Sequence, residues 1–88
     1  MYFVAVQYGE IESSVKVKLD REVFDISKKF NSSGVQSLTE LSKRPKNDDG
    51  TVDIAYIFLD PTDANNFKEE VKGLDKAISA ILMNIQLS

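Results

Sequence analysis

The chain has 88 residues, of which 42% are hydrophobic and 28% are charged; its formal net charge is −3, and it contains neither cysteine nor histidine. This length and composition predict one globular domain over residues 1–88 with a single compact core. The two missing residue types exclude disulfides, thiolate catalysis, cysteine-ligated zinc and the most common general base, and they favour a reducing, cytoplasmic setting.

The first predicted element is a strand over residues 2–8, which carries apolar residues on both faces. Such a strand is normally covered on both sides. After a short polar connection, residues 14–19 alternate apolar residues with Lys16 and Lys18. This alternation predicts a half-buried strand at the edge of an antiparallel sheet, where lysines discourage pairing with other chains.

Two Leu-Asp pairs, at residues 19–20 and 59–60, each follow a strand-like run and precede a helix-like run. An aspartate at this position accepts hydrogen bonds from the free N–H groups of a helix's first turn. The repeat therefore predicts that helices begin at Asp20 and at Asp60. The first of these helices is predicted to stop at the polar run of residues 31–34.

Residues 35–44 allow two interpretations. As a helix, the segment would be capped by Ser33, with Gln36 three residues later as in a capping box. As a strand, it would pair with the next strand across a turn and make the second half of the chain resemble the first. Local residue preferences favour the helix and the repeat favours the strand, so both interpretations stay open.

The last predicted elements are a central strand and a long helix. An acidic turn at residues 45–51 leads into the strand at residues 52–59, which is apolar on both faces. The final helix is predicted from Asp60 through Gly73 to residue 87, because apolar residues recur at spacings of four and three. The chain is therefore predicted to adopt an α+β fold: an antiparallel sheet of three to four strands with two main helices, in the order ββα(β)βα.

Motifs that carry chemistry are not found in the sequence. The four glycines stand alone, so no phosphate-binding loop is formed. With Gly50 as the sixth residue of a calcium loop, the first and twelfth residues would be Pro45 and Tyr56, and neither is the required carboxylate. Apolar runs are too short to cross a bilayer. We therefore expect no enzyme activity, no cofactor, no metal and no membrane partner.

Excess apolar residues in the C-terminal segment predict an interface. From Ala77 onward, they exceed what one stripe of a surface helix requires, and such a patch is rarely left uncovered. The residues predicted to bind a partner are Ile78, Ile81, Leu82, Ile85 and Leu87. The predicted function is that of a small cytoplasmic regulator or inhibitor that binds another protein and self-associates, of the kind that phages and mobile elements direct at host proteins.

An alternative prediction is a module that binds RNA or single-stranded nucleic acid. Eight lysines and arginines against six acidic residues give residues 1–46 a charge of +2, whereas residues 47–88 carry −5. The candidate contacts to phosphate are Lys16, Lys18, Lys43 and Arg44. Aromatic residues of the first strand would stack on bases. The sequence pI of about 4.8 favours protein binding over this alternative.

Overall fold

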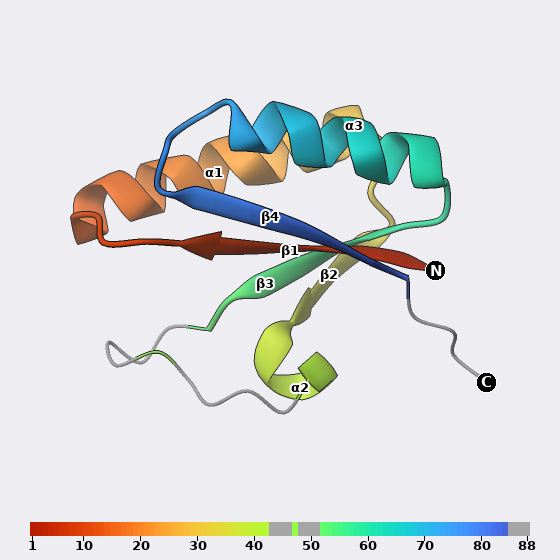
Figure 1. Cartoon of the computed structure of the whole chain (residues 1–88), viewed down its shortest axis with the longest axis horizontal. Helices are drawn as coiled ribbons and strands as arrows, with labels where there is room; N and C mark the ends of the chain where they lie inside the picture. The colour runs from red at the N-terminus through yellow and green to blue at the C-terminus, as the bar shows by residue number, and fades with distance from the viewer. Residues whose placement is uncertain (43–46, 48–51, 85–88) are drawn as a thin grey trace.

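The computed structural model describes residues 1–42, 47 and 52–84 (Figure 1). In chain order the elements are β1 (Tyr2–Tyr8), α1 (Ser13–Lys29), β2 (Gly34–Ser37), α2 (Leu38–Ser42), β3 (Ile54–Phe58), α3 (Pro61–Lys72) and β4 (Ile78–Asn84). The strands form one antiparallel sheet in the order β2-β3-β1-β4. Apart from the short α2, this is the split β-α-β arrangement. The predicted α+β fold, with its antiparallel sheet and two main helices, is confirmed.

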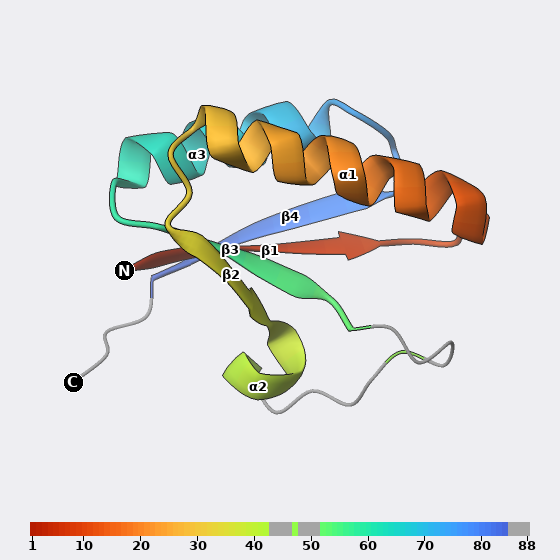
Figure 2. The same cartoon turned by 180° about the vertical axis from the view of Figure 1, so that it is seen from behind.

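Helices α1 and α3 cover one face of the sheet, and α2 lies on the other side (Figures 1 and 2). The chain places α1 between β1 and β2 and α3 between β3 and β4, so each helix follows one strand and returns the chain to another. No helix among the described residues is long and apolar enough to cross a membrane.

The main core lies between the sheet and the two long helices. Phe67 on α3 is fully buried, and its ring lies 5.1 Å from the ring centroids of both Tyr56 and Phe58. A smaller cluster on the opposite face contains Phe3 and Leu38, the latter at the start of α2. Since β1 contributes to both clusters, the prediction that it is covered on both sides is confirmed.

The segment predicted as a second strand, residues 14–19, is instead the beginning of α1. The helix buries Leu19, Val23 and Ser27, which are spaced by four residues along one face. Burial of this stripe outweighs the strand preference of the valines at the start of the segment. Asp20 therefore lies inside the helix, and its predicted role as an N-cap is wrong.

The other helix boundaries follow local signals. Asp60 is the N-cap of α3, and its Oδ1 accepts a 2.7 Å hydrogen bond from the N–H of Thr62, as predicted. Helix α1 stops at the predicted polar run, where Asn31 adopts a left-handed φ of 62°. The ambiguous segment fits each interpretation only in part. Strand β2 occupies residues 34–37 and pairs with β3, as the strand interpretation predicts, whereas the helix α2 begins only at Leu38 and not after Ser33.

The predicted C-terminal helix is wrong beyond Lys72. Helix α3 ends with Gly73 as its C-cap, and the N–H of Ala77 bonds to Oδ1 of Asp75 at 2.8 Å in a tight turn. The chain then forms β4, which pairs with β1 along seven residue pairs. The apolar residues that exceed one helical stripe instead alternate between the two faces of a strand. The predicted order of elements thus fits only roughly, although the fold class is correct.

Candidate functional site

The three described residues of the set predicted to bind a partner lie on β4 rather than on a helix. Ile78 is buried in the main core and Leu82 packs against it. Ile81 points to the opposite face and is 49% exposed. Ile85 and Leu87 lie outside the described residues. Of the described residues in the predicted set, two therefore belong to the core and one is exposed. The prediction of a wide apolar helix face is wrong.

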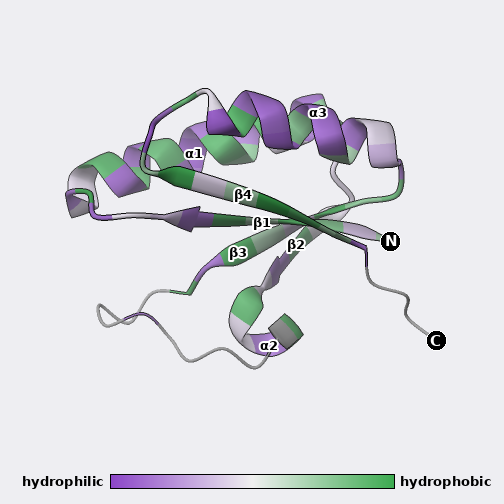
Figure 3. Cartoon of the chain, viewed as in Figure 1, coloured by the Kyte–Doolittle hydropathy of each residue, from purple (hydrophilic) through white to green (hydrophobic). Residues whose placement is uncertain are grey.

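Strand β4 nevertheless presents an uncharged edge of the sheet. Its sequence, ISAILMN, contains no charged residue, no proline and no glycine. Hydrophobic residues follow one another along most of this strand (Figure 3). Within the described part of the chain, β4 pairs with β1 on one side and with no strand on its outer side. The outer backbone groups of β4 therefore form a template for another strand.

The residues of the nucleic-acid alternative do not form a row. Lys16 and Lys18 lie on α1, and two residues on a helix differ by about 200° in direction. Phe3, one of the predicted stacking residues, is 1% exposed and cannot reach a base. Lys43 and Arg44 lie outside the described residues. Among the described residues, Lys16 lies beside the ring of Tyr8 on the first strand, whereas Lys18 points in another direction.

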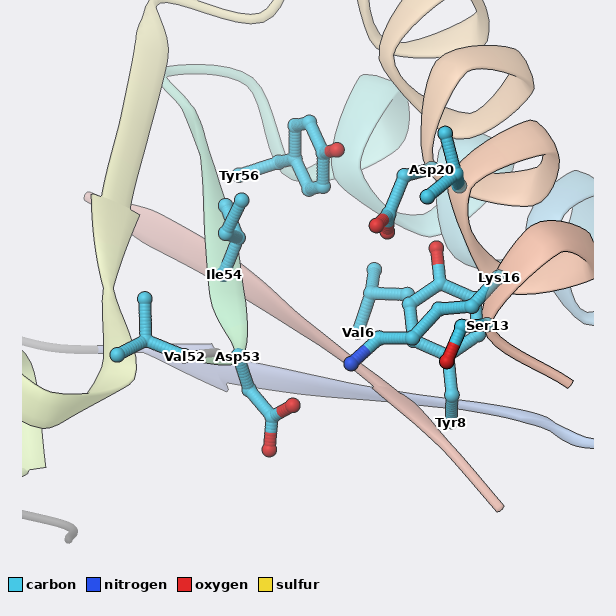
Figure 4. A pocket seen from close by; sticks show the side chains of 10 residues that line it. Val6, Tyr8, Ser13, Lys16, Asp20, Val52, Asp53, Ile54 and Tyr56 are labelled. Atoms are coloured by element: carbon cyan, nitrogen blue, oxygen red, sulfur yellow. The ribbon is translucent and has the colours of Figure 1, made fainter. Parts of the chain in front are cut away.

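A pocket of about 290 Å³ lies between the first half of α1 and the sheet. Figure 4 shows side chains from α1, β1, β3 and the segment before β3 converging on it. Its apolar lining comes from Val6, Val17, Val52 and Ile54. Its polar lining comes from Tyr8, Ser13, Lys16, Asp20, Asp53 and Tyr56. The pocket therefore combines an apolar wall with oxygen atoms of several chemical types.

Asp20 lies between two tyrosine hydroxyls at the helix side of the pocket (Figure 4). The Tyr8 hydroxyl oxygen is buried and has no partner in hydrogen-bonding geometry among the described residues. Burial raises the pKa of Tyr8, and the nearby Asp20 carboxylate raises it further. Burial, followed by the Asp20 charge, also raises the pKa of Tyr56 to about 12. Both phenols therefore stay protonated at neutral pH, beside a carboxylate that has no ion-pair partner among the described residues.

The mouth of the pocket is arranged around Asp53. Gln7 Nε2 donates to Asp53 Oδ2 at 3.3 Å, and Asn47 Nδ2 donates to Asp53 Oδ1 at 3.2 Å. Lys16 extends from α1 with its Nζ 5.7 Å from the centroid of the Tyr8 ring, and its ammonium group points away from Asp20 (Figure 4). A wider and more polar hollow of about 620 Å³ adjoins this mouth and shares Tyr8, Lys16 and Asp53 with the pocket.

No local pattern in the sequence indicates this pocket. Asp20 is predicted as a helix cap and Lys16 as an outward residue of a strand, and only the observed start of α1 puts both on the same helix, four residues apart. Tyr8 and Tyr56 belong to strands that are far apart in the sequence, so no local motif links them. An available signal is the spacing of Leu19, which extends the helical stripe upstream of Asp20.

Comparison of the chain with protein-family models, with curated proteins and with solved structures finds no match. The features that carry functional information are therefore the edge of β4 and the pocket beneath α1.

Proposed function

We propose that the protein is a non-catalytic protein-binding module that self-associates through the outer edge of β4. The observation that supports this proposal is the uncharged seven-residue sequence of that strand. Natural proteins generally protect an exposed sheet edge with lysines, prolines, bulges or very short strands. The other edge strand, β2, has only four residues. Strand β4 has none of these protections, so an edge contact is consistent with its sequence.

The occupant that fits this edge best is a second copy of β4 in antiparallel orientation. Two identical strands without charges do not repel each other, and a two-fold axis at Ile81 would place this residue opposite its own copy. The pairing would cover a side chain that is 49% exposed and would extend the sheet from four strands to eight. Cross-strand pairs of β-branched residues stabilise such contacts.

We further predict that the dimer binds another protein in the cytoplasm and regulates or inhibits it. An origin in a phage or mobile element is part of the same hypothesis. These finer statements stay predictions. Purification of the tagged protein from its native host, followed by identification of the proteins that remain bound in the wild type but not in a β4 variant, would identify such a partner.

Sedimentation velocity tests the dimer directly. We expect the wild type to sediment as a dimer at tens of micromolar, and Ile81→Lys to sediment as a monomer because the lysine places like charges on both sides of the contact. Val35→Lys is the matched control, since Val35 lies on the opposite edge strand and is 48% exposed, nearly the same as Ile81. Circular dichroism confirms that both variants remain folded.

The control variant is expected to remain dimeric. A wild type that stays monomeric at 100 micromolar would contradict the proposal, and so would equal dissociation of both variants. Equal dissociation would mean that added charge weakens association wherever it is placed.

A further inference from the structure

We propose that the pocket beneath α1 binds a primary alkylammonium group. The nitrogen would lie between Asp20 and the hydroxyls of Tyr8 and Tyr56, with its alkyl chain along Val6 and Ile54. The pocket volume of about 290 Å³ is close to the lower end of the range for small-ligand sites. The proposal is independent of self-association, because the pocket lies under α1 and the proposed contact lies at the outer edge of β4.

The oxygen atoms at the helix side of the pocket match the donors of an ammonium group. A primary ammonium has three N–H donors and no acceptor. Asp20 offers a carboxylate, and the two neighbouring phenol oxygens can each accept a hydrogen bond (Figure 4). Since the phenols remain protonated at neutral pH, their own protons can turn toward Asp20 while their lone pairs face the ligand. A carboxylic acid would instead place its negative charge against Asp20.

The charge balance also favours a cation. Asp20 and Asp53 both line the pocket, and Lys16 is the one cationic side chain that lines it among the described residues. Its ammonium group points away from Asp20 and toward the mouth, so the helix side of the pocket keeps its negative charge (Figure 4). The aromatic rings of Tyr8 and Tyr56 add the attraction of a cation to a π face.

The buried hydroxyl of Tyr8 depends on Asp20 in the free protein. Its oxygen has no partner in full hydrogen-bonding geometry among the described residues, yet burial and the nearby Asp20 carboxylate, by a hydrogen bond and by its charge, raise the pKa of the phenol. This single contact leaves acceptor capacity on both groups, which an ammonium group can use.

The apolar wall sets the kind of chain that the ammonium carries. Valine and isoleucine side chains contact methylene groups favourably but offer no hydrogen bond, so a linear alkyl chain fits better than a sugar or a polyamine. A free alkylamine and the side chain of a lysine on a partner protein present the same group. The experiment therefore includes both sources.

The test is an NMR titration of the isotope-labelled protein with pentylammonium chloride. We expect saturable shifts confined to the pocket residues, and binding of 1-pentanol weaker by roughly tenfold, because the neutral hydroxyl loses the charge-assisted bonds to Asp20. Titration with N-acetyllysine methylamide distinguishes the sources. If it binds as well as pentylammonium, the site accepts a partner's lysine; if only pentylammonium binds, the ligand is a free amine.

Two variants of the pocket and one control variant make the titration decisive. Asp20→Asn is expected to weaken pentylammonium binding by roughly tenfold or more, whereas Asp25→Asn, the same charge change at an exposed position of α1, leaves it unchanged. Tyr8→Phe is expected to weaken pentylammonium binding about two- to tenfold, because the ligand loses one oxygen acceptor. Equal binding of pentanol and pentylammonium would overturn the proposal, as would equal effects of the two aspartate variants.

Discussion

Helices α1 and α3 cover the same face of the sheet in different ways. Helix α3 fully buries Ala64, Phe67 and Val71 along its length, so it is packed on the strands from its first turn. The buried residues of α1 begin only at Leu19, and the six residues before it leave a pocket beneath them. Helix α3 therefore stabilises the fold along its whole length, whereas the first half of α1 leaves space for a binding site.

The largest expected effect comes from the core of α3. Phe67→Ala is expected to lower the free energy of unfolding by about 3–5 kcal/mol, because the fully buried ring packs on Tyr56 and Phe58 and its removal leaves a cavity. This is a large part of the roughly 5–15 kcal/mol typical of a whole domain. Urea denaturation followed by circular dichroism measures the change.

The matched variant on α1 is Val17→Ala. Val17 is 61% exposed, so its truncation is expected to change the free energy of unfolding by no more than about 0.5 kcal/mol. Similar losses for the two variants would show that the first turns of α1 pack as closely as α3, and the comparison between the helices would then fail.

The next effect tests how well α1 closes the pocket. An unfolded tyrosine titrates near pH 10, whereas the pKa of Tyr56 is raised to about 12 and that of Tyr8 is also raised. Between pH 10 and 12 the unfolded chain therefore loses protons that the folded protein keeps. The free energy of unfolding is expected to fall as pH rises, by up to about 1.4 kcal/mol per pH unit for each tyrosine.

Urea denaturation at pH 9, 10 and 11 measures this slope, and Tyr56→Phe serves as the comparison. The variant is expected to lose stability less steeply above pH 10 than the wild type, because lysine titration contributes equally to both. Parallel curves for the two proteins would mean that water reaches the Tyr56 hydroxyl from the pocket.

The third prediction separates the two aspartates. Asp60→Ala is expected to cost about 1 kcal/mol, since Asp60 accepts the hydrogen bond from Thr62 that begins α3. Asp20→Ala is expected to cost nothing or to stabilise slightly, because Asp20 lies inside α1, where alanine is the better helix former. Thermal unfolding of both variants gives the comparison, and an equal loss would mean that the contact of Asp20 with Tyr8 stabilises the free protein.

The same pair of helices explains what could be predicted from the sequence. The start of α3 was predictable because its signals are local: a capping aspartate, a proline at the first turn and a further acidic residue, Asp63. The start of α1 was not, because its N-cap, Glu12, makes no side-chain capping hydrogen bond. The six residues upstream of Leu19 continue the helix without a buried side chain, so no apolar stripe marks this part of α1 in the sequence.

Strand β4 and the pocket could not be predicted for a related reason. An apolar segment becomes a strand or a helix according to what it pairs with, and β4 forms because β1 offers it a full edge. The pocket joins Val6 to Tyr56, so it exists only after the sheet has formed. The sequence nevertheless identified Ile81, Lys16 and Asp20 as residues of interest, although it assigned each of them to the wrong element or role.

The smallest expected effect concerns the contact that joins the two helices. Lys29 Nζ lies 3.0 Å from Glu70 Oε1, and the two side chains are 62% and 39% exposed. Solvent screens such a pair, so Glu70→Gln is expected to lower the free energy of unfolding by no more than about 0.5 kcal/mol. Even this loss is expected to shrink in 1 M salt, where screening acts over about 3 Å.

The matched control is Glu69→Gln, which makes the same charge change one position earlier on α3. Glu69 faces Lys68 at 3.8 Å, and adjacent residues on a helix do not support each other well, so no measurable loss is expected. A double-mutant cycle between Lys29 and Glu70 isolates the pair energy. A coupling above 1 kcal/mol would mean that the ion pair rather than the buried stripe of α1 holds this helix against α3, and the pocket would then depend on a surface contact.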